Sequence, residues 1–221
     1  MKLYKYLPRE YADLILNEGC FLFRSLSYFQ DYEDDEVRGD RFEGVQKYSG
    51  KDGLEINNLT SGKASRENWI FKSKVDSENI FIFSASLIFS KELSKEFEAD
   101  TCIEITDASK IISGLRSAVK RRRSVKPNKL FYGEVEYYQD SKEPGIDWAF
   151  PDRISNRKLN TFSHQKEYRF AFSTKNALKF GNTEQQVQMS DQPSVKRERP
   201  YPEKILKIGN IKQWCVVHDL T

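Results

Sequence analysis

Short apolar and aromatic segments, separated by polar stretches of unequal length, constrain the fold of this 221-residue chain most strongly. The segments ENIFIFSAS and TCIEIT are rich in β-branched and aromatic residues, which is typical of strands. Strands outnumber helices in this pattern, the helices cluster early, and no βα unit of constant length recurs. The sequence therefore predicts an α+β fold over a single domain, residues 1–221, and not a doubly wound α/β fold.

The expected elements are short and are separated by turn signals. Pro8 ends a first strand, Gly19 stops a first helix, and Asp107 is placed to cap a later helix. We expect strands at Lys2–Leu7, Cys20–Arg24, Glu78–Ser86, Thr101–Thr106, Leu130–Tyr138, Glu167–Phe172, Lys204–Ile208 and Gln213–Val217, and helices at Arg9–Asn17, 90–97 and 107–123. Polar composition predicts a loop that crosses the surface at 25–44, a mobile insertion with one short strand at 48–66, and a loop at 174–202.

Charge and cysteine usage restrict the class of protein. Lys and Arg (36) nearly balance Asp and Glu (33), so the net charge of +3 does not by itself indicate a partner. Cys20, Cys102 and Cys215 are odd in number and form no CxxC pair, which predicts buried free thiols in a reducing compartment. The N-terminal segment MKLYKYLPREY has no apolar run, so we expect a cytoplasmic protein with no membrane partner.

Standard catalytic signatures are absent from the chain. GxGxxG, P-loop, HExxH and GxSxG motifs do not occur, and two histidines with dispersed cysteines predict no metal centre. The remaining polar candidates fall in three places that strand pairing can bring together. They are the start (Tyr4, Lys5, Tyr6), the segment after the second strand (Arg24, Ser25, Ser27, Tyr28, Asp31, Arg38, Glu43), and Glu167 with Arg169.

Glu167 is the strongest catalytic candidate. Alternation in KEYRFAF places Glu167 and Arg169 on one face of a strand and Tyr168 on the other. Such a pair is either part of a site or a structural ion pair at a strand end.

Two further segments have the chemistry of nucleotide or nucleic-acid contacts. Tyr28 and Phe29 should point to opposite sides of an extended chain, and Tyr28 is our choice for stacking on a ring in an open cleft. The stretch 120–129 (KRRRSVKPNK) is cationic. Its candidates for phosphate contact are Arg121, Arg122, Arg123 and Lys126. The alternative is a solvated helix terminus.

The order of several short motifs resembles a widespread prokaryotic domain family of uncharacterised function. The motifs are LYKY, ILNEG followed by FLFRSLSYFQDYED, FIFSAS followed by TCIEIT, LFYGEVEYY, FSHQKEYRFAF and KILKIG, and they cover nearly the whole chain. One departure is LSKEF, which stands where the family pattern has Trp and Tyr after the FSAS strand.

The same layout resembles, more weakly, the ADP-ribosyltransferase fold, which implies a split β-sheet with a few peripheral helices. In that fold the first strand carries an NAD-contacting residue, the second carries Ser or Tyr, and a late strand carries Glu. The resemblance maps Lys5 or Tyr6, beside Tyr4, to the first position, where those enzymes usually have Arg or His. It maps Ser25, Ser27 and Tyr28 to the second position and Glu167 to the third.

This resemblance implies NAD as substrate and a defined division of roles. Tyr28 would stack on the nicotinamide, Arg24 or Arg38 would hold the pyrophosphate, and Glu167 would hydrogen-bond the ribose 2′-hydroxyl. With the cationic stretch, it implies a toxin of phage defence or of a toxin–antitoxin system that modifies nucleic-acid bases, with RNA favoured over DNA and an antitoxin protein as a further partner.

Two other functions fit the sequence. A non-catalytic nucleotide- or nucleic-acid-binding domain would use the same cleft without needing Glu167. A metal-dependent nuclease would need clustered carboxylates, which the acidic run of Asp31, Glu33, Asp34, Asp35 and Glu36 offers.

Overall fold

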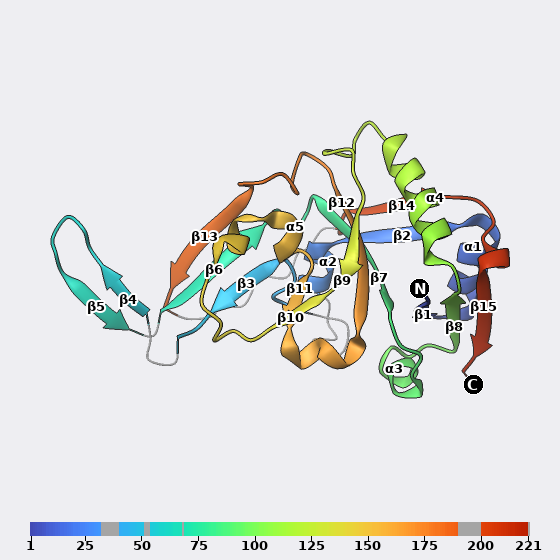
Figure 1. Cartoon of the computed structure of the whole chain (residues 1–221), viewed down its shortest axis with the longest axis horizontal. Coiled ribbons are helices and arrows are strands. Elements are labelled where there is room, and N and C mark those ends of the chain that lie inside the picture. Colours follow the sequence, from blue (N-terminus) through green and yellow to red (C-terminus); the bar gives the residue numbers. More distant parts are fainter. Residues whose placement is uncertain (32–39, 51–53, 68, 190–199, 221) are drawn as a thin grey trace.

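The computed structural model describes residues 1–31, 40–50, 54–67, 69–189 and 200–220, and these form a mixed α+β structure (Figure 1). The α+β class is therefore as predicted. Within the described residues, no helix is long and apolar enough to cross a membrane.

The largest element is an eight-stranded sheet in which the described neighbours pair antiparallel. Its main path runs β14-β2-β7-β1-β8-β15, while β12 pairs with the other edge of β7 and is followed by β9. The strands are β1 (Leu3–Leu7), β2 (Cys20–Ser25), β7 (Ile80–Ser86), β8 (Thr101–Ile105), β9 (Phe131–Glu134), β12 (Glu167–Ser173), β14 (Glu203–Lys207) and β15 (Cys215–Asp219).

Three smaller sheets extend from this one. A three-stranded sheet has the order β13-β6-β3, β10 pairs parallel with β11, and β4 pairs with β5 in a hairpin that projects from the body at the opposite end from both termini (Figure 1). Their strands are β3 (Val45–Tyr48), β4 (Leu54–Asn57), β5 (Ala64–Glu67), β6 (Ile70–Val75), β10 (Glu136–Tyr138), β11 (Arg157–Leu159) and β13 (Thr183–Gln188).

Helices are peripheral, and local sequence sets their ends. Pro8 stands at the N-cap of the first helix, and Gly19 closes it in the left-handed region (φ +60°), where its N–H bonds to the Ile15 carbonyl at 2.9 Å. Asp107 accepts from the Ser109 N–H at 3.0 Å and so caps the fourth helix. The helices are α1 (Arg9–Glu18), α2 (Leu26–Gln30), α3 (Lys91–Glu96), α4 (Ala108–Lys120) and α5 (Pro151–Ile154), with 3-10 turns η1 (Ile146–Ala149), η2 (Asn160–Gln165) and η3 (Lys212–Trp214).

The two faces of the large sheet differ in chemistry. On β12, Tyr168, Phe170 and Phe172 belong to the main apolar core, which also contains side chains of α1 and α4; we call this the core face. Glu167 and Arg169 point to the other side, the cleft face. The alternation predicted for this strand is therefore confirmed, although all seven residues of β12 are buried.

Most of the predicted elements are found close to their expected bounds, and four predictions are wrong. The surface loop predicted at 25–44 is wrong for its described parts, residues 25–31 and 40–44, because α2 begins at Leu26 and both Leu26 and Glu43 are buried. The segment expected as one strand at Leu130–Tyr138 divides at buried Val135 into β9 and β10, which lie in different sheets. The insertion at 48–66 contains a two-stranded hairpin, and the loop at 174–202 contains β13.

All three cysteines are free, as predicted. The predicted burial is found only for Cys102, because Cys20 and Cys215 are half-buried at the first residues of β2 and β15.

Candidate functional site

The sheet splits beside β7, and the split creates the candidate site. On one edge of β7, Arg24 of β2 lies opposite Ile82, and Tyr4 of β1 lies opposite Ser86. Between these two contacts, Ser84 has no described strand neighbour on that edge. Strands β1 and β2 therefore diverge from β7 and leave a gap between them, with α1 connecting their far ends.

Lys5 bridges the gap. Its ammonium donates to the Ser84 carbonyl at 2.7 Å, so it satisfies a main-chain acceptor at the place where the strand ladder is interrupted. The same ammonium lies 4.6 Å from the centre of the Phe83 ring. Lys5, which the sequence placed among the NAD contacts, thus forms a hydrogen bond that holds β1 to β7 within the cleft.

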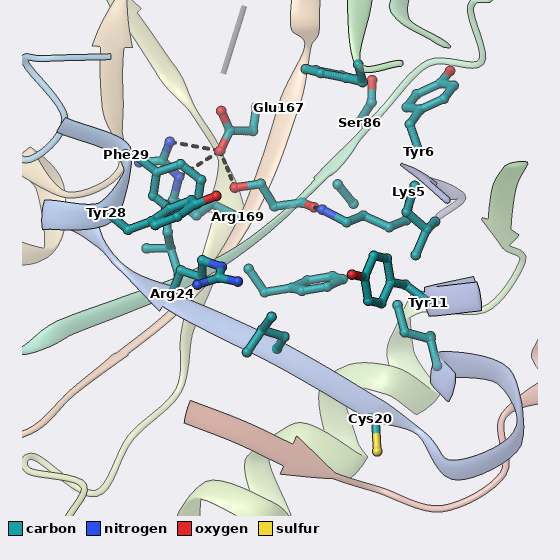
Figure 2. A pocket seen from close by; sticks show the side chains of 18 of the residues that line it. Lys5, Tyr6, Tyr11, Cys20, Arg24, Tyr28, Phe29, Ser86, Glu167 and Arg169 are labelled. Carbon is teal, nitrogen blue, oxygen red and sulfur yellow. Dashed lines mark hydrogen bonds and ion pairs between the residues drawn. The ribbon is translucent and has the colours of Figure 1, made fainter. Parts of the chain in front are cut away.

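A cavity of about 770 Å³ occupies the split and opens on the cleft face. Its size falls in the range of small-molecule sites. Residues that the sequence singled out come together on its walls, as Figure 2 shows for several of them: Tyr4, Lys5, Tyr6, Arg24, Tyr28, Glu43, Glu167 and Arg169.

Glu167 lies at the deep end of the cavity in a buried ionic network. Its Oε1 accepts from the Ser84 hydroxyl and from the Arg169 Nε at 2.8 Å, and its Oε2 lies 3.3 Å from the Lys158 ammonium. Figure 2 shows the contact between Glu167 and Arg169. Arg169 also donates to both carboxylate oxygens of Glu43, at 2.7 and 3.2 Å. Side-chain exposure is at most 7% for all four charged groups, so the network is an interior one.

The network contains more carboxyl groups than cationic groups. Among the described residues, three buried carboxyls (Asp40, Glu43, Glu167) share two buried cations (Lys158, Arg169). Burial raises the pKa of Glu43 to about 7 and also raises the pKa of Asp40, whose Oδ2 has no hydrogen-bond partner. The pKa of Glu167 is lowered, because Arg169, Lys158 and the Ser84 hydroxyl together outweigh its desolvation. Glu167 is therefore the carboxylate that stays ionised.

An aromatic and cationic pair forms another wall of the cavity. The Arg24 guanidinium lies 4.4 Å from the centre of the Tyr28 ring and forms an ion pair with Glu203 at 2.9 Å. Tyr28 also packs edge-on against Tyr201 at 5.6 Å. Its ring is half-buried and borders the cavity.

The expected geometry around Tyr28 is wrong in one respect. Tyr28 and Phe29 lie in the short helix α2 and not in an extended chain, so they do not point to opposite sides; their rings are 5.1 Å apart and both border the cavity. Ser25 and Ser27 lie outside the cavity lining, because both are fully buried and their hydroxyls bond to each other at 2.9 Å. Arg38 lies outside the described residues.

The cationic stretch is not part of the cavity. Arg121 is the C-cap of α4, a helix that packs on the core face, whereas the cavity opens on the cleft face. Arg121, Arg123 and Lys126 are exposed, and Arg122 donates to the main-chain carbonyl of Ile205 on β14. Within the described residues, the stretch reaches the large sheet at two separate places: Arg122 contacts the edge strand β14, and the Lys126 N–H donates to the Ser173 carbonyl at the end of β12 at 2.8 Å.

Sequence reasoning missed Lys158 and Ser84, and it noted Glu43 only as one of several polar residues. Lys158 stands on β11, a strand of three residues with no periodic pattern, and its ammonium also contacts Gln165 Oε1 at 3.2 Å. The one signal that could have found Ser84 was the register of β12 against β7, because Ser84 lies directly opposite Arg169.

The acidic run considered for a metal begins at Asp31, and its other members lie outside the described residues. Within the described part of the chain, no group of three or more His, Cys, Asp or Glu side chains is arranged to hold a metal ion.

Comparison with known proteins gives no relative: no family model, no curated protein and no solved structure matches this chain.

Proposed function

We propose that the chain is an NAD-dependent ADP-ribosyltransferase that modifies nucleic acid, with the cavity between β1 and β2 as its active site. The observation that carries the proposal is the position of Glu167: it is an ionised carboxylate on the cavity wall, at the place where the sheet splits. Toxin action, in phage defence or with an antitoxin, belongs to the same proposal.

The chemistry asks for a fixed negative charge. Cleavage of the bond between nicotinamide and ribose C1′ leaves positive charge on the ribose as the bonding electrons leave with nicotinamide. A carboxylate held in place by Ser84 and Arg169 needs no reorganisation to stabilise that charge. An acceptor amine or hydroxyl then forms the new bond to C1′ and loses its proton.

Other groups on the cavity wall suit the remaining parts of NAD. Tyr28, backed by Arg24, offers a ring for stacking on nicotinamide, and Arg24 would hold the pyrophosphate by exchanging its partly exposed ion pair with Glu203 for the phosphates. Tyr4 and Tyr6 border the β1 side of the cavity. Tyr6 is the more constrained of the two, since its hydroxyl accepts from the Ser90 N–H at 2.6 Å and donates to the Ile88 carbonyl at 3.0 Å.

A second function is favoured by the pairing of Glu167 within the ionic network. Glu167, Lys158, Arg169 and Glu43 are paired with one another, as they would also be in a domain that binds a nucleotide without cleaving it. In that case Glu167 holds the cleft together and touches no reacting atom.

The discriminating experiment compares Glu167→Gln with wild type. NAD binding is measured by calorimetry, and release of nicotinamide is measured by chromatography in the presence of RNA, DNA or neither. The transferase predicts that E167Q retains NAD binding within about threefold and loses nicotinamide release by about 100-fold or more.

Glu104→Gln is the matched control. Glu104 is a buried carboxylate of the same sheet that pairs with Lys2 at 2.6 Å and His218 at 2.9 Å and does not line the cavity. E104Q should keep wild-type nicotinamide release. Binding of NAD with no release by the wild type would instead support the binding domain.

A further inference from the structure

The shallow half of the cavity is an apolar shelf. It is formed by Tyr11 and Leu14 of α1, Leu22 of β2 and Ile205 of β14, with Leu22 directly opposite Ile205 in the strand register. These four large apolar side chains are 37–52% exposed, although the deep end of the same cavity is buried. The shelf therefore offers an exposed apolar surface that belongs to the same cavity as Glu167.

Ion pairs at the rim neutralise the charges beside the shelf. Arg24 pairs with Glu203 at 2.9 Å, and Lys207 pairs with Glu18 at 2.8 Å. The shelf thus suits a neutral planar group better than a phosphate.

Cations lie on the other side of the same edge strand. Arg122 donates to the main-chain carbonyl of Ile205, so the end of α4 touches the residue whose side chain forms part of the shelf. Arg121 and Arg123, the sequence neighbours of Arg122, are exposed. Because β14 is the terminal strand of the main path, Arg122 brings the end of α4 to the same edge strand whose Ile205 side chain forms part of the shelf.

We propose that a single-stranded nucleic acid crosses the outer edge of β14, with phosphates on Arg121 and Arg123 and one base on the shelf. This inference rests on the proposed function and names the acceptor of that site as an unpaired base. The base enters from the shelf and faces the deep end of the cavity, where Glu167 lies.

The geometry favours a single strand over a duplex. Bases within a duplex are stacked and paired, and a flat apolar surface can take a base only after it has left the stack. A cationic surface beside an apolar one also matches the alternation of phosphate and base along a single strand.

The test is fluorescence anisotropy, without NAD, of a labelled 12-nucleotide single-stranded RNA, the DNA of the same sequence, and the corresponding duplex. Wild type should bind at least one single strand at least tenfold more tightly than the duplex. R121A/R123A should reduce the magnitude of the slope of log K against log salt by about 1.4, since each phosphate contact with a single strand contributes about 0.7.

Ile205→Ser and Leu14→Ser should each weaken binding by about 5- to 100-fold with an unchanged salt slope, because stacking on the shelf is lost and phosphate contacts remain. The charge-matched control is K91A/K95A on α3, whose lysines are exposed and which lies beyond the opposite end of α4 from the cationic stretch (Figure 1). It should leave both affinity and slope unchanged.

Three results would overturn the inference: equal affinity for duplex and single strand, an equal loss in K91A/K95A, or shelf variants that lose NAD binding and keep oligonucleotide binding. Its failure is separable from that of the transferase. If the protein binds oligonucleotides through the shelf but releases no nicotinamide, this inference stands and the transferase is rejected. If it transfers ADP-ribose without binding oligonucleotides through the shelf, the transferase stands and this inference is rejected.

Discussion

Replacing Arg169 by methionine should destabilise the protein strongly. The guanidinium is 1% exposed and holds two carboxylates, donating to Glu43 at 2.7 and 3.2 Å and to Glu167 at 2.8 Å. It also donates to the Ser155 carbonyl at 2.6 Å. Methionine fills a similar volume and offers no donor, so the change removes the charge while leaving little cavity.

The magnitude follows from which partners remain. Removing one member of a buried ion pair costs about 3–5 kcal/mol, because the remaining carboxylate must either stay charged in the interior without its cation or take up a proton. Glu43 loses both guanidinium contacts, whereas Glu167 keeps Lys158 and Ser84. We therefore expect R169M to lose about 3–5 kcal/mol of unfolding free energy, out of the roughly 5–15 kcal/mol typical of a folded domain.

Urea denaturation followed by tryptophan fluorescence measures this loss. The double variant R169M/E43Q should recover about half of it, because the uncompensated carboxylate is gone even though its hydrogen bonds are not restored. If R169M loses less than about 1 kcal/mol, or if the double variant is less stable than the single one, the ionic network does not hold the cleft as argued.

Three further predictions concern stability. Because burial raises the folded-state pKa of Glu43 from 4.5 to about 7, folding favours its protonated form, and that contribution to stability is lost as pH rises from about 5 through 7. Glu167 has a lowered pKa in the folded state, so its contribution to stability is lost as pH falls below about 4.5. The thermal midpoint should therefore be highest at about pH 4.5–5 and fall on either side. Gly19→Ala should cost more than about 1 kcal/mol of unfolding free energy, since Gly19 has φ +60° and a Cβ there would overlap the Gly209 carbonyl oxygen. Gly62 has a similar φ of +66° but open space around it, so in the same denaturation assay Gly62→Ala should show a smaller loss that comes only from the backbone conformation. Asp107→Ala should cost about 1 kcal/mol through loss of the α4 cap, and a midpoint unchanged in urea would contradict this.

Local sequence signals were sufficient for elements with strong periodicity or clear caps. The alternation in β12 placed Glu167 and Arg169 on one face, and Asp107 and Gly19 marked helix ends as they do in the structure. Strand β13 was not predicted because its sequence, TEQQVQ, is polar on both faces; it is a strand because it pairs with β6.

The site was only partly predictable for a related reason. Glu167 and Tyr28 stand in recognisable segments, but the network that holds Glu167 needs Lys158 and Glu43, which come from short or irregular segments and meet it only through the tertiary fold. The split itself follows from how β1 and β2 divide the edge of β7, and no local pattern records that division.

The most direct test of the transferase uses bacterial cells that express wild type, Glu167→Ala or the control Glu104→Gln. Growth is scored, and extracted RNA, DNA and protein are probed for label from radiolabelled NAD. The account predicts growth inhibition and label in the nucleic-acid pool for wild type and E104Q, with both lost in E167A. Equal growth and no label in any pool would contradict it and leave the nucleotide-binding domain as the function of the cleft.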